Sequence, residues 1–579
     1  MSFIIHYSGG KLIESRMLKK KSSPAPAYLC EDKKTFCLGE IFQTNYNTIA
    51  KSDWKNNPMV LNSYKGTISI AYAGEEECIF ACDSNDIDVL YYYHNNGEFM
   101  ISDDLWDIAR RLEIKFEDIN QSWVRKGIIS QLINGETVIK NLKILLPSNI
   151  GTYTLSSDEL KIKEYTDFKY SGQVKSVDEA VERMDHVIDE AFGLMKEKWG
   201  ADCVYGMGLS GGLDSRVIPH YIKKHNMKLT TFNICVKKPH KLFIASSCKN
   251  AKKLADRFAV PFKLIEWNPN TISKKLRLKT KMHPIGTCRN IFKLELAGMP
   301  KFDILLSGGY GVLIGDYLPL DIMSLDKEGL IAAIENLFIG MNNSTVTFKS
   351  RCIKALNYVF HLNIKDSSKY DIEELDDFFK NDFAEARKEV VDFVTPLYDC
   401  GKYNNIDIFY KYFVSMLCSR DRFGAFESQF GTRRSMTLYM PFVFEETKNW
   451  NPELLLDRIV LKELIRQKTS EVSEIATDTF TAAPVANPGV IQKMMAVLNR
   501  VIRGNGTAID EHHFNNKHIQ KEMHKCMNSK YSWFYKILDT RSINHKVLTR
   551  PHLRMAVAIW EMKYLIDYIE SGQYKNEKK

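Results

Sequence analysis

The decisive stretch of the sequence is Met207-Gly208-Leu209-Ser210-Gly211-Gly212-Leu213-Asp214-Ser215-Arg216. An apolar run over residues 204–209 predicts a strand that leads into it, and residues 217–224 predict the helix that follows. Ligands of open parallel sheets bind outside the carboxyl ends of the strands, and a helix N-terminus offers unpaired N–H groups and partial positive charge to an anion. The stretch therefore predicts a phosphate-binding turn.

Each polar or flexible residue of this turn has a physical role in that prediction. Gly211 and Gly212 let the backbone approach a phosphate without an intervening Cβ, and the hydroxyls of Ser210 and Ser215 can donate hydrogen bonds. Asp214 is the expected magnesium ligand. The alternative is a glycine-rich turn that only closes a tight connection between strand and helix.

Strand and helix patterns alternate around this turn. Helices are expected from Ser176, where a capping box starts, and over 245–258, and strands over 229–236 and 262–266. Such alternation predicts a doubly wound parallel sheet, which places the second part of the chain in the α/β class. Beyond about residue 316 the periodicity is mostly helical, over 367–392, 405–430, 451–475 and 551–570.

The first 170 or so residues have a different pattern, of short strands punctuated by turns. Strands are expected over 66–72, 77–82 and 89–93, and Asn95-Asn96-Gly97 is typical of a hairpin turn. A second hairpin is expected over 150–165. The strand pattern ends before Gly172, and we predict the domain boundary at this residue.

Composition excludes several other classes of protein. The chain has 579 residues, of which 44% are hydrophobic and 26% charged, as in ordinary globular proteins. No apolar run approaches the ~20 residues of a membrane span, and the N-terminus lacks a secretory pattern, so a cytoplasmic protein without membrane association is expected. A net charge of +9, spread along the chain, suits an anionic small molecule better than a nucleic acid. The 12 cysteines lack zinc-site spacing and are expected to be reduced and mostly buried.

The decisive stretch resembles the PP-loop, SGGxDS, of the ATP pyrophosphatases, which cleave ATP between its α and β phosphates. The rest of the chain resembles the two-domain asparagine synthetase group within that family. The likeness rests on residues 137–153, similar to the junction between the group's domains, on 82–104, similar to its hairpin, and on 231–234, similar to the strand that packs on adenine.

The resemblance implies three parts: an α+β N-terminal-nucleophile amidotransferase-like domain over 1–172, a PP-loop synthetase domain over 173–485, and a helical extension over 486–579. It implies ATP and Mg²⁺ as cofactors, with Asp214 as the metal ligand. The implied nucleotide-binding residues are Leu209, Ser210, Gly211, Gly212, Asp214, Ser215, Ile234, Ser307 and Gly308.

Three departures from the group bear on function. Working glutaminase domains need a Cys directly after the initiator Met, and here Ser2 follows, a much weaker nucleophile, so the glutaminase is expected to be inactive, as in the β-lactam-forming relatives. In the synthetase domain, Val312 and Leu313 stand near the position of the family's acidic pair that would hold magnesium, and Asp316 comes three to four positions later, so the second metal ligand is not carried over. The family's lysine after residue 474 is also missing, and Lys462 and Lys468 are candidates to replace it.

Tyr310 and Glu427 are the candidate catalytic residues. Tyr310 falls where the β-lactam-forming branch has a tyrosine that helps to deprotonate the attacking amine, and Glu427 could accept the same proton. The alternatives are a tyrosine packed at the mouth of a loop and a surface glutamate on a long helix.

The sequence thus predicts an enzyme, an AMP-forming carbon–nitrogen ligase of the asparagine synthetase type. It would activate aspartate or another carboxylate as an acyl-adenylate, release pyrophosphate, and transfer the acyl group to ammonia or an amine. Its expected partners are these small molecules and no nucleic acid, and a homodimer is compatible with the sequence. The alternative is a nucleotide-binding pseudoenzyme that has lost turnover, which the missing acidic residues near Val312 favour.

Overall fold

The structure is a computed structural model. It describes residues 2–18, 27–84, 88–129, 135–235, 246–266, 298–306, 321–338, 373–420, 439–475 and 553–576, with short pieces at 268–271, 274, 276–277, 280, 314–315, 318–319, 434–436, 477, 485 and 521.

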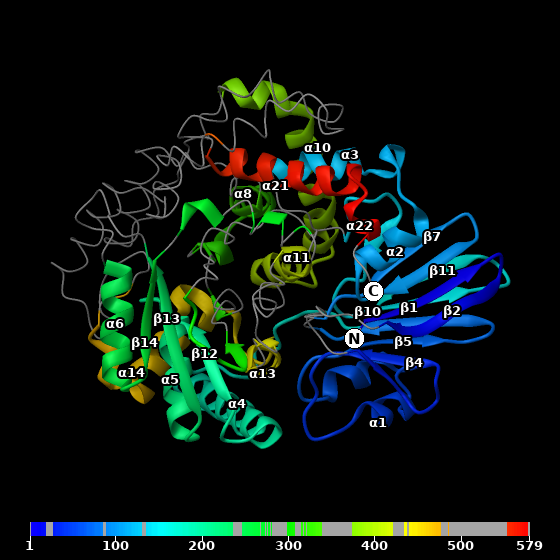
Figure 1. The fold of residues 1–579 in the computed structure, drawn as a ribbon. Coiled ribbons are helices and arrows are strands. Elements are labelled where there is room, and N and C mark those ends of the chain that lie inside the picture. Colours follow the sequence, from blue (N-terminus) through cyan, green and yellow to red (C-terminus); the bar gives the residue numbers. More distant parts are fainter. Residues whose placement is uncertain are drawn as a thin grey trace.

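The N-terminal domain is built on two antiparallel sheets (Figure 1). The first has the order β2-β1-β8-β7-β9 and the second β11-β10-β6-β5-β4-β3. The strands are β1 (Ser2–Ser8), β2 (Lys11–Leu18), β3 (Tyr28–Leu29), β4 (Thr35–Leu38), β5 (Ser69–Ala73), β6 (Glu77–Cys82), β7 (Tyr91–Asn95), β8 (Glu98–Ser102), β9 (Leu142–Ile144), β10 (Asn149–Thr154) and β11 (Glu159–Glu164).

Alternation along these strands produces four layers. Phe3 and Ile5 of β1 point into a core between the two sheets, while Ile4 between them belongs to a separate core on the outer face of the first sheet. Helices α2 (Leu105–Leu112) and α3 (Gln121–Ile129) close that outer core. On the outer face of the second sheet, Trp54 packs close to α1 (Tyr46–Lys51). The domain is therefore helix, sheet, sheet, helix, an α+β arrangement as the sequence predicts.

Both expected hairpins are present. Asn96 and Gly97 join β7 to β8 with φ values of 50° and 78°, the left-handed conformation that a two-residue hairpin turn requires. Strands β10 and β11 pair in register from Asn149 opposite Glu164 to Thr154 opposite Glu159. The predicted limits of these strands agree with the structure to within a few residues.

The second domain contains a five-stranded parallel sheet with the order β14-β13-β12-β15-β16. Its strands are β12 (Val204–Gly208), β13 (Lys228–Cys235), β14 (Phe262–Glu266), β15 (Ile304–Leu306) and β16 (Arg434–Met436). In chain order, β13 pairs with β12 and β14 pairs with β13, and β15 then pairs with the opposite side of β12. The strand order therefore reverses between β12 and β15. Gly206 in β12 lies against the Phe302 ring, where a Cβ would come within 2.3 Å of ring atoms.

The helices beside this sheet are α4 (Val177–Trp199), α5 (Asp214–Lys224) and α6 (Ser246–Phe258), which share one hydrophobic core with β12 and β15 (Figure 1). The N-cap half of the predicted capping box is present, because Ser176 Oγ accepts a hydrogen bond from the Glu179 N–H at 3.2 Å, while the Glu179 side chain pairs with Arg183. Helix α5 starts at Asp214, three residues before the predicted start at 217.

The chain after the sheet is mainly helical, as expected, with one correction. The expected helix over 451–475 is broken: η8 (Pro452–Arg458) is a 3₁₀ segment that ends in non-helical backbone at Leu456 and Asp457, before α14 (Ile459–Lys468) and α15 (Ser470–Ser473). Other helices are α8 (Lys327–Phe338), α10 (Glu373–Asp399), α11 (Asn405–Arg420), α13 (Tyr439–Thr447), α21 (Leu553–Glu570) and α22 (Gln573–Asn576).

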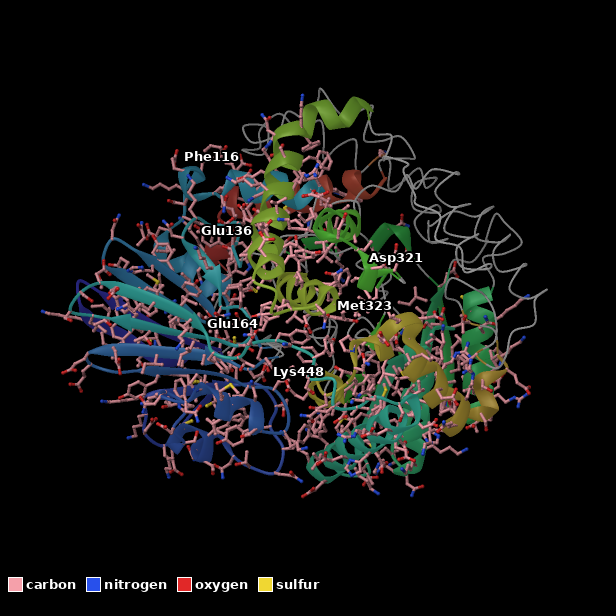
Figure 2. All side chains as sticks on the ribbon, turned by 180° about the vertical axis from the view of Figure 1, so that it is seen from behind. Phe116, Glu136, Glu164, Asp321, Met323 and Lys448 are labelled. Atoms are coloured by element: carbon pink, nitrogen blue, oxygen red, sulfur yellow. The ribbon has the colours of Figure 1, made fainter. Side chains whose placement is uncertain are left out.

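The two domains are joined by polar contacts and by shared helices. The linker residue Asp167 accepts hydrogen bonds from Lys402, Lys411 (2.9 Å) and Tyr403 (2.8 Å). Figure 2 labels Glu164 and Lys448 on the two sides of this junction, where Lys411 also reaches Glu164 at 3.3 Å.

The C-terminal helices return to the N-terminal domain (Figure 1). Helix α21 packs on α3, and the Trp106 ring of α2 contacts Tyr568 and Tyr574 with ring centroids 4.9 and 5.8 Å apart. The described part of the predicted extension over 486–579 thus completes the outer core of the first sheet.

The seven cysteines whose side chains the structure describes are free, and four of them are buried: Cys30, Cys37, Cys78 and Cys82. None of the helices that the structure describes has the length and apolar character required to cross a membrane.

Candidate functional site

The candidate site is the loop of residues 209–213, between the carboxyl end of β12 and the first residue of α5. The loop is anchored to the neighbouring strand β13 at Leu209, whose N–H donates to the Phe232 carbonyl at 2.8 Å and whose carbonyl accepts from Asn233 Nδ2 at 2.8 Å. Ile234, the predicted adenine contact, follows Asn233 and is partly exposed. The structure therefore brings the predicted residues of β12, the loop and β13 to one edge of the sheet.

Ser210 of the loop and Ser215 in the first turn of α5 both form hydrogen bonds with the loop. Ser215 Oγ donates to the Ser210 carbonyl at 2.8 Å, and the two hydroxyl oxygens lie 3.0 Å apart. The Gly212 N–H donates to Ser210 Oγ at 3.1 Å. In this arrangement the hydroxyls fix the shape of the turn.

Arg216 is a buried residue that the sequence did not indicate as functional, and its side chain holds the loop through hydrogen bonds to loop carbonyls. Its side chain is completely buried. The guanidinium donates to the carbonyls of Gly211 (3.0 Å) and Gly212 (3.2 Å) in the loop. On its other side it donates to the carbonyls of Val472 (2.8 Å) and Ile475 (2.7 Å), which follow α14. One buried cation thus ties the loop to a segment more than 250 residues later in the sequence.

The orientation of two loop carbonyls determines where the loop N–H groups point. In a trans peptide the C=O and the next N–H point in opposite directions. Because the Gly211 and Gly212 carbonyls face Arg216, the N–H groups of Gly212 and Leu213 point away from it. The Gly212 N–H donates to Ser210 Oγ, so the Leu213 N–H and the N-terminus of α5 form the donor-rich end that a phosphate favours.

Asp214, the predicted magnesium ligand, pairs with Arg458 in this structure. Arg458 Nη2 donates to Asp214 Oδ1, and the two side chains are 8% and 27% exposed. Within the described residues there is no group of three or more His, Cys, Asp or Glu side chains arranged to hold a metal ion. A single carboxylate still fits Mg²⁺ that arrives with a nucleotide, because such an ion takes one or two protein carboxylates and completes its shell with phosphate oxygens and water.

Arg458 reaches the site because the expected long helix is broken. Asp457 and Arg458 both have positive φ, 52° and 57°, which turns the chain between η8 and α14. Gly315, a few residues after β15, packs against this bend, where a Cβ would lie 1.8 Å from the Leu455 carbonyl oxygen. The Gly315 backbone has a φ of 102°, which favours glycine.

The two lysines considered as replacements for the missing family lysine form ion pairs elsewhere. Lys462 Nζ lies 2.6 Å from Asp457 Oδ1, and Lys468 Nζ lies 2.8 Å from Oδ2 of Asp185 on α4. Burial alone would raise the pKa of Asp185, but hydrogen bonds from Lys468 and Tyr221 hold it below its ordinary value. Ser307, Gly308, Tyr310 and Glu427 lie outside the described residues, as do Val312 and Leu313.

Ser2 occupies the position that the resemblance assigns to a glutaminase nucleophile. Its side chain is fully buried. The hydroxyl donates to Asp103 Oδ1 at 2.6 Å and lies 2.9 Å from Asp107 Oδ2, which belongs to the first turn of α2. Asp103 also accepts from the Phe3 N–H at 2.9 Å. The hydroxyl therefore has acidic partners and holds β1 to the start of α2.

Comparison with known proteins does not identify a family or an activity for this chain. No protein-family model matches the chain, and no curated protein matches it. Among solved structures, the glutamine phosphoribosylpyrophosphate amidotransferase from B. subtilis, complexed with ADP and GMP, is 11% identical, with a TM-score of 0.18 over 52% of this chain and 91% of that one. An allosteric regulatory enzyme of purine biosynthesis is 9% identical, with a TM-score of 0.17 over 44% of this chain and 63% of that one. Similarity this low supports no assignment of fold or activity, so the functional argument rests on the site.

Proposed function

We propose that the chain is an ATP-dependent, AMP-forming carbon–nitrogen ligase whose nucleotide site is the loop of residues 209–213. The observation that carries the proposal is the position of this loop: it follows β12, where the strand order reverses toward β15, and it leads into the N-terminus of α5. Ligands of open α/β sheets bind at such a reversal. The resemblance of residues 210–215 to the PP-loop supports ATP as the ligand.

In the proposed reaction a carboxylate oxygen attacks the α-phosphorus of ATP, the bond to the β-phosphate bridging oxygen breaks, and pyrophosphate leaves. The nitrogen of ammonia or an amine then attacks the acyl carbon, loses a proton to a base, and displaces AMP. Mg²⁺ at Asp214 would neutralise charge on the leaving pyrophosphate. In-line attack at phosphorus depends mainly on positioning and charge neutralisation, which the loop N–H groups and the α5 N-terminus can supply.

The acyl acceptor in this proposal is ammonia or an amine taken directly from solution. The buried Ser2 hydroxyl with its two acidic neighbours supports an inactive glutaminase, because neither carboxylate makes serine as nucleophilic as a cysteine thiolate. Asparagine synthesis from aspartate is one form of the reaction, and another carboxylate is the other. On the resemblance alone, Tyr310 or Glu427 is proposed to accept the amine proton.

Product analysis tests the proposal. Radiolabelled ATP and Mg²⁺ are incubated with aspartate or pooled carboxylates plus ammonium, and AMP and ADP are separated. The proposal predicts AMP with pyrophosphate, abolished in Asp214→Asn and retained in the control Asp202→Asn, whose carboxylate lies in the same domain and pairs with Lys228. Formation of ADP and phosphate instead would contradict it.

The second candidate is a nucleotide-binding protein without turnover. The ion pair between Asp214 and Arg458 favours it, because a carboxylate held by a buried cation is less accessible to a metal ion. This candidate predicts ATP binding with no AMP from any substrate mixture.

A further inference from the structure

The strongest unexplained feature of the site is Arg458, a cation that the sequence resemblance does not assign. Its guanidinium meets Asp214 across 244 residues of sequence, and its side chain is more than nine-tenths buried. Asp214 lies at the first position of α5, directly after the loop that turns its N–H groups away from Arg216. Arg458 therefore lies at the same end of the sheet as the proposed phosphate site.

The backbone holds Arg458 in this place. The residue is left-handed, with φ 57° and ψ 38°, a conformation that is unfavourable for a side chain of this size. Gly315 approaches closely enough that a Cβ there would be 3.4 Å from Arg458 Cγ, and the Gly315 N–H is fixed by the Tyr410 hydroxyl at 3.0 Å. Arg458 therefore lies against two residues that come after neighbouring parallel strands in the sequence, Asp214 after β12 and Gly315 after β15.

The charges at this position create a competition. Mg²⁺ and Arg458 cannot both use the same Asp214 carboxylate oxygens fully, and a buried guanidinium that loses its partner is strongly unfavourable. A polyphosphate that enters with Mg²⁺ supplies a replacement, because guanidinium groups bind phosphate oxygens through paired N–H donors. After this exchange of partners, Asp214 neutralises charge on Mg²⁺ and the phosphate oxygens neutralise Arg458.

We propose that Arg458 is a polyphosphate-binding residue, paired with Asp214 when no nucleotide is bound and with the phosphates of ATP or pyrophosphate when Mg²⁺ takes Asp214. This inference rests on the proposed function, because it assigns a role at the same nucleotide site. It adds a cation from the bend between η8 and α14 as a partner for the β and γ phosphates, which AMP lacks.

Calorimetric titration of the full chain with three probes tests the inference: ATP and pyrophosphate, each with Mg²⁺, and AMP. In Arg458→Gln we expect binding of Mg²⁺-ATP and of pyrophosphate to weaken at least tenfold, with AMP binding within twofold of wild type. The matched control is Arg466→Gln, which removes an arginine of α14, the helix that begins directly after Arg458; Arg466 pairs with Glu463. It should bind all three probes as wild type does.

A second variant of opposite expected sign covers the case in which Arg458→Gln does not fold. Without Mg²⁺, Asp214→Asn removes the Asp214 carboxylate that competes with phosphate for Arg458, so pyrophosphate binding should strengthen several-fold. That gain should disappear in the double variant Asp214→Asn/Arg458→Gln.

The outcomes separate this inference from the proposed function. Wild-type binding of ATP together with unchanged binding in Arg458→Gln, or a gain that persists in the double variant, would overturn the role of Arg458 and leave the nucleotide site standing. Failure of the wild type to bind either ATP or pyrophosphate would overturn both.

Discussion

Replacement of Arg216 by lysine tests the claim that a buried guanidinium shapes the nucleotide loop. Arg216 bridges two pairs of carbonyls on opposite sides, those of Gly211 and Gly212 in the loop and those of Val472 and Ile475 after α14. A lysine keeps the charge, but its compact ammonium group cannot span both pairs. We therefore expect Arg216→Lys to lose two of the four hydrogen bonds, those on one side.

The size of the effect follows from these bonds. A hydrogen bond to a charged group contributes about 1.5–3 kcal/mol, so the loss of two destabilises the ordered loop by about 3 kcal/mol. At about 1.4 kcal/mol for each factor of ten, the equilibrium constant for ordering the loop falls about 100-fold, and the fraction of molecules with an ordered loop falls by at most that factor. Because only that fraction binds, the apparent Kd for ATP rises by up to the same factor.

The assay combines calorimetric ATP binding with hydrogen exchange of the amides over residues 209–218. Arg216→Lys should bind ATP more weakly and exchange these amides faster, while the control Arg183→Lys, on α4 and 45% exposed, should behave as wild type. ATP affinity within twofold of wild type, with the loop amides equally protected, would refute the role assigned to Arg216.

Three further predictions follow from other contacts. Gly206→Ala should lower the midpoint of thermal unfolding, by the equivalent of about 1–3 kcal/mol, because its Cβ would come within 2.3 Å of the Phe302 ring, whereas Gly208→Ala, with its nearest atom at 3.8 Å, should be nearly neutral; equal midpoints would contradict this. Partial burial opposes ionisation of Asp167, but hydrogen bonds from two lysines and a tyrosine lower its pKa to about 2. The lowered pKa stabilises the fold fully above about pH 4, and this is lost as the pH falls toward 2. With the side chain 36% exposed, screening reduces the contribution to about 1 kcal/mol, so Asp167→Asn should be less stable to urea at pH 7 by that amount and by less at pH 3; a difference that does not depend on pH would contradict the ion pairs. Ser2→Ala should leave ammonia-dependent AMP formation within about twofold of wild type, and neither protein should release glutamate from glutamine; glutamate release by wild type would show a working glutaminase.

Local chemistry explains which features of the fold the sequence could predict. The helix N-cap at Ser176 and the turn at Asn96 and Gly97 depend on a few neighbouring residues, and both are present as expected. The strand that precedes Gly208 was equally clear, because a short apolar run ends there in a glycine-rich turn.

The missed features depend on contacts between distant parts of the chain. Strand β16 has only three residues and exists through its pairing with β15, which no local pattern reveals. The break at Asp457 and Arg458 interrupts a helical periodicity without a local sign, because Pro452 stands at the start of η8, where proline is compatible with a helix. The clue to Arg216 was a cation in the first turn of α5, directly before the buried Val217 and Ile218 in the sequence. Arg458 had no comparable signal, because its partner Asp214 lies 244 residues away.

An experimental structure of the chain with Mg²⁺ and an ATP analogue whose α,β bridging oxygen is replaced by methylene tests the nucleotide site most directly. We expect the triphosphate at the Leu213 N–H and the start of α5, with Asp214 on the metal side. An analogue bound at another edge of the sheet, or on the N-terminal domain, would contradict the claim that residues 209–213 form the nucleotide site.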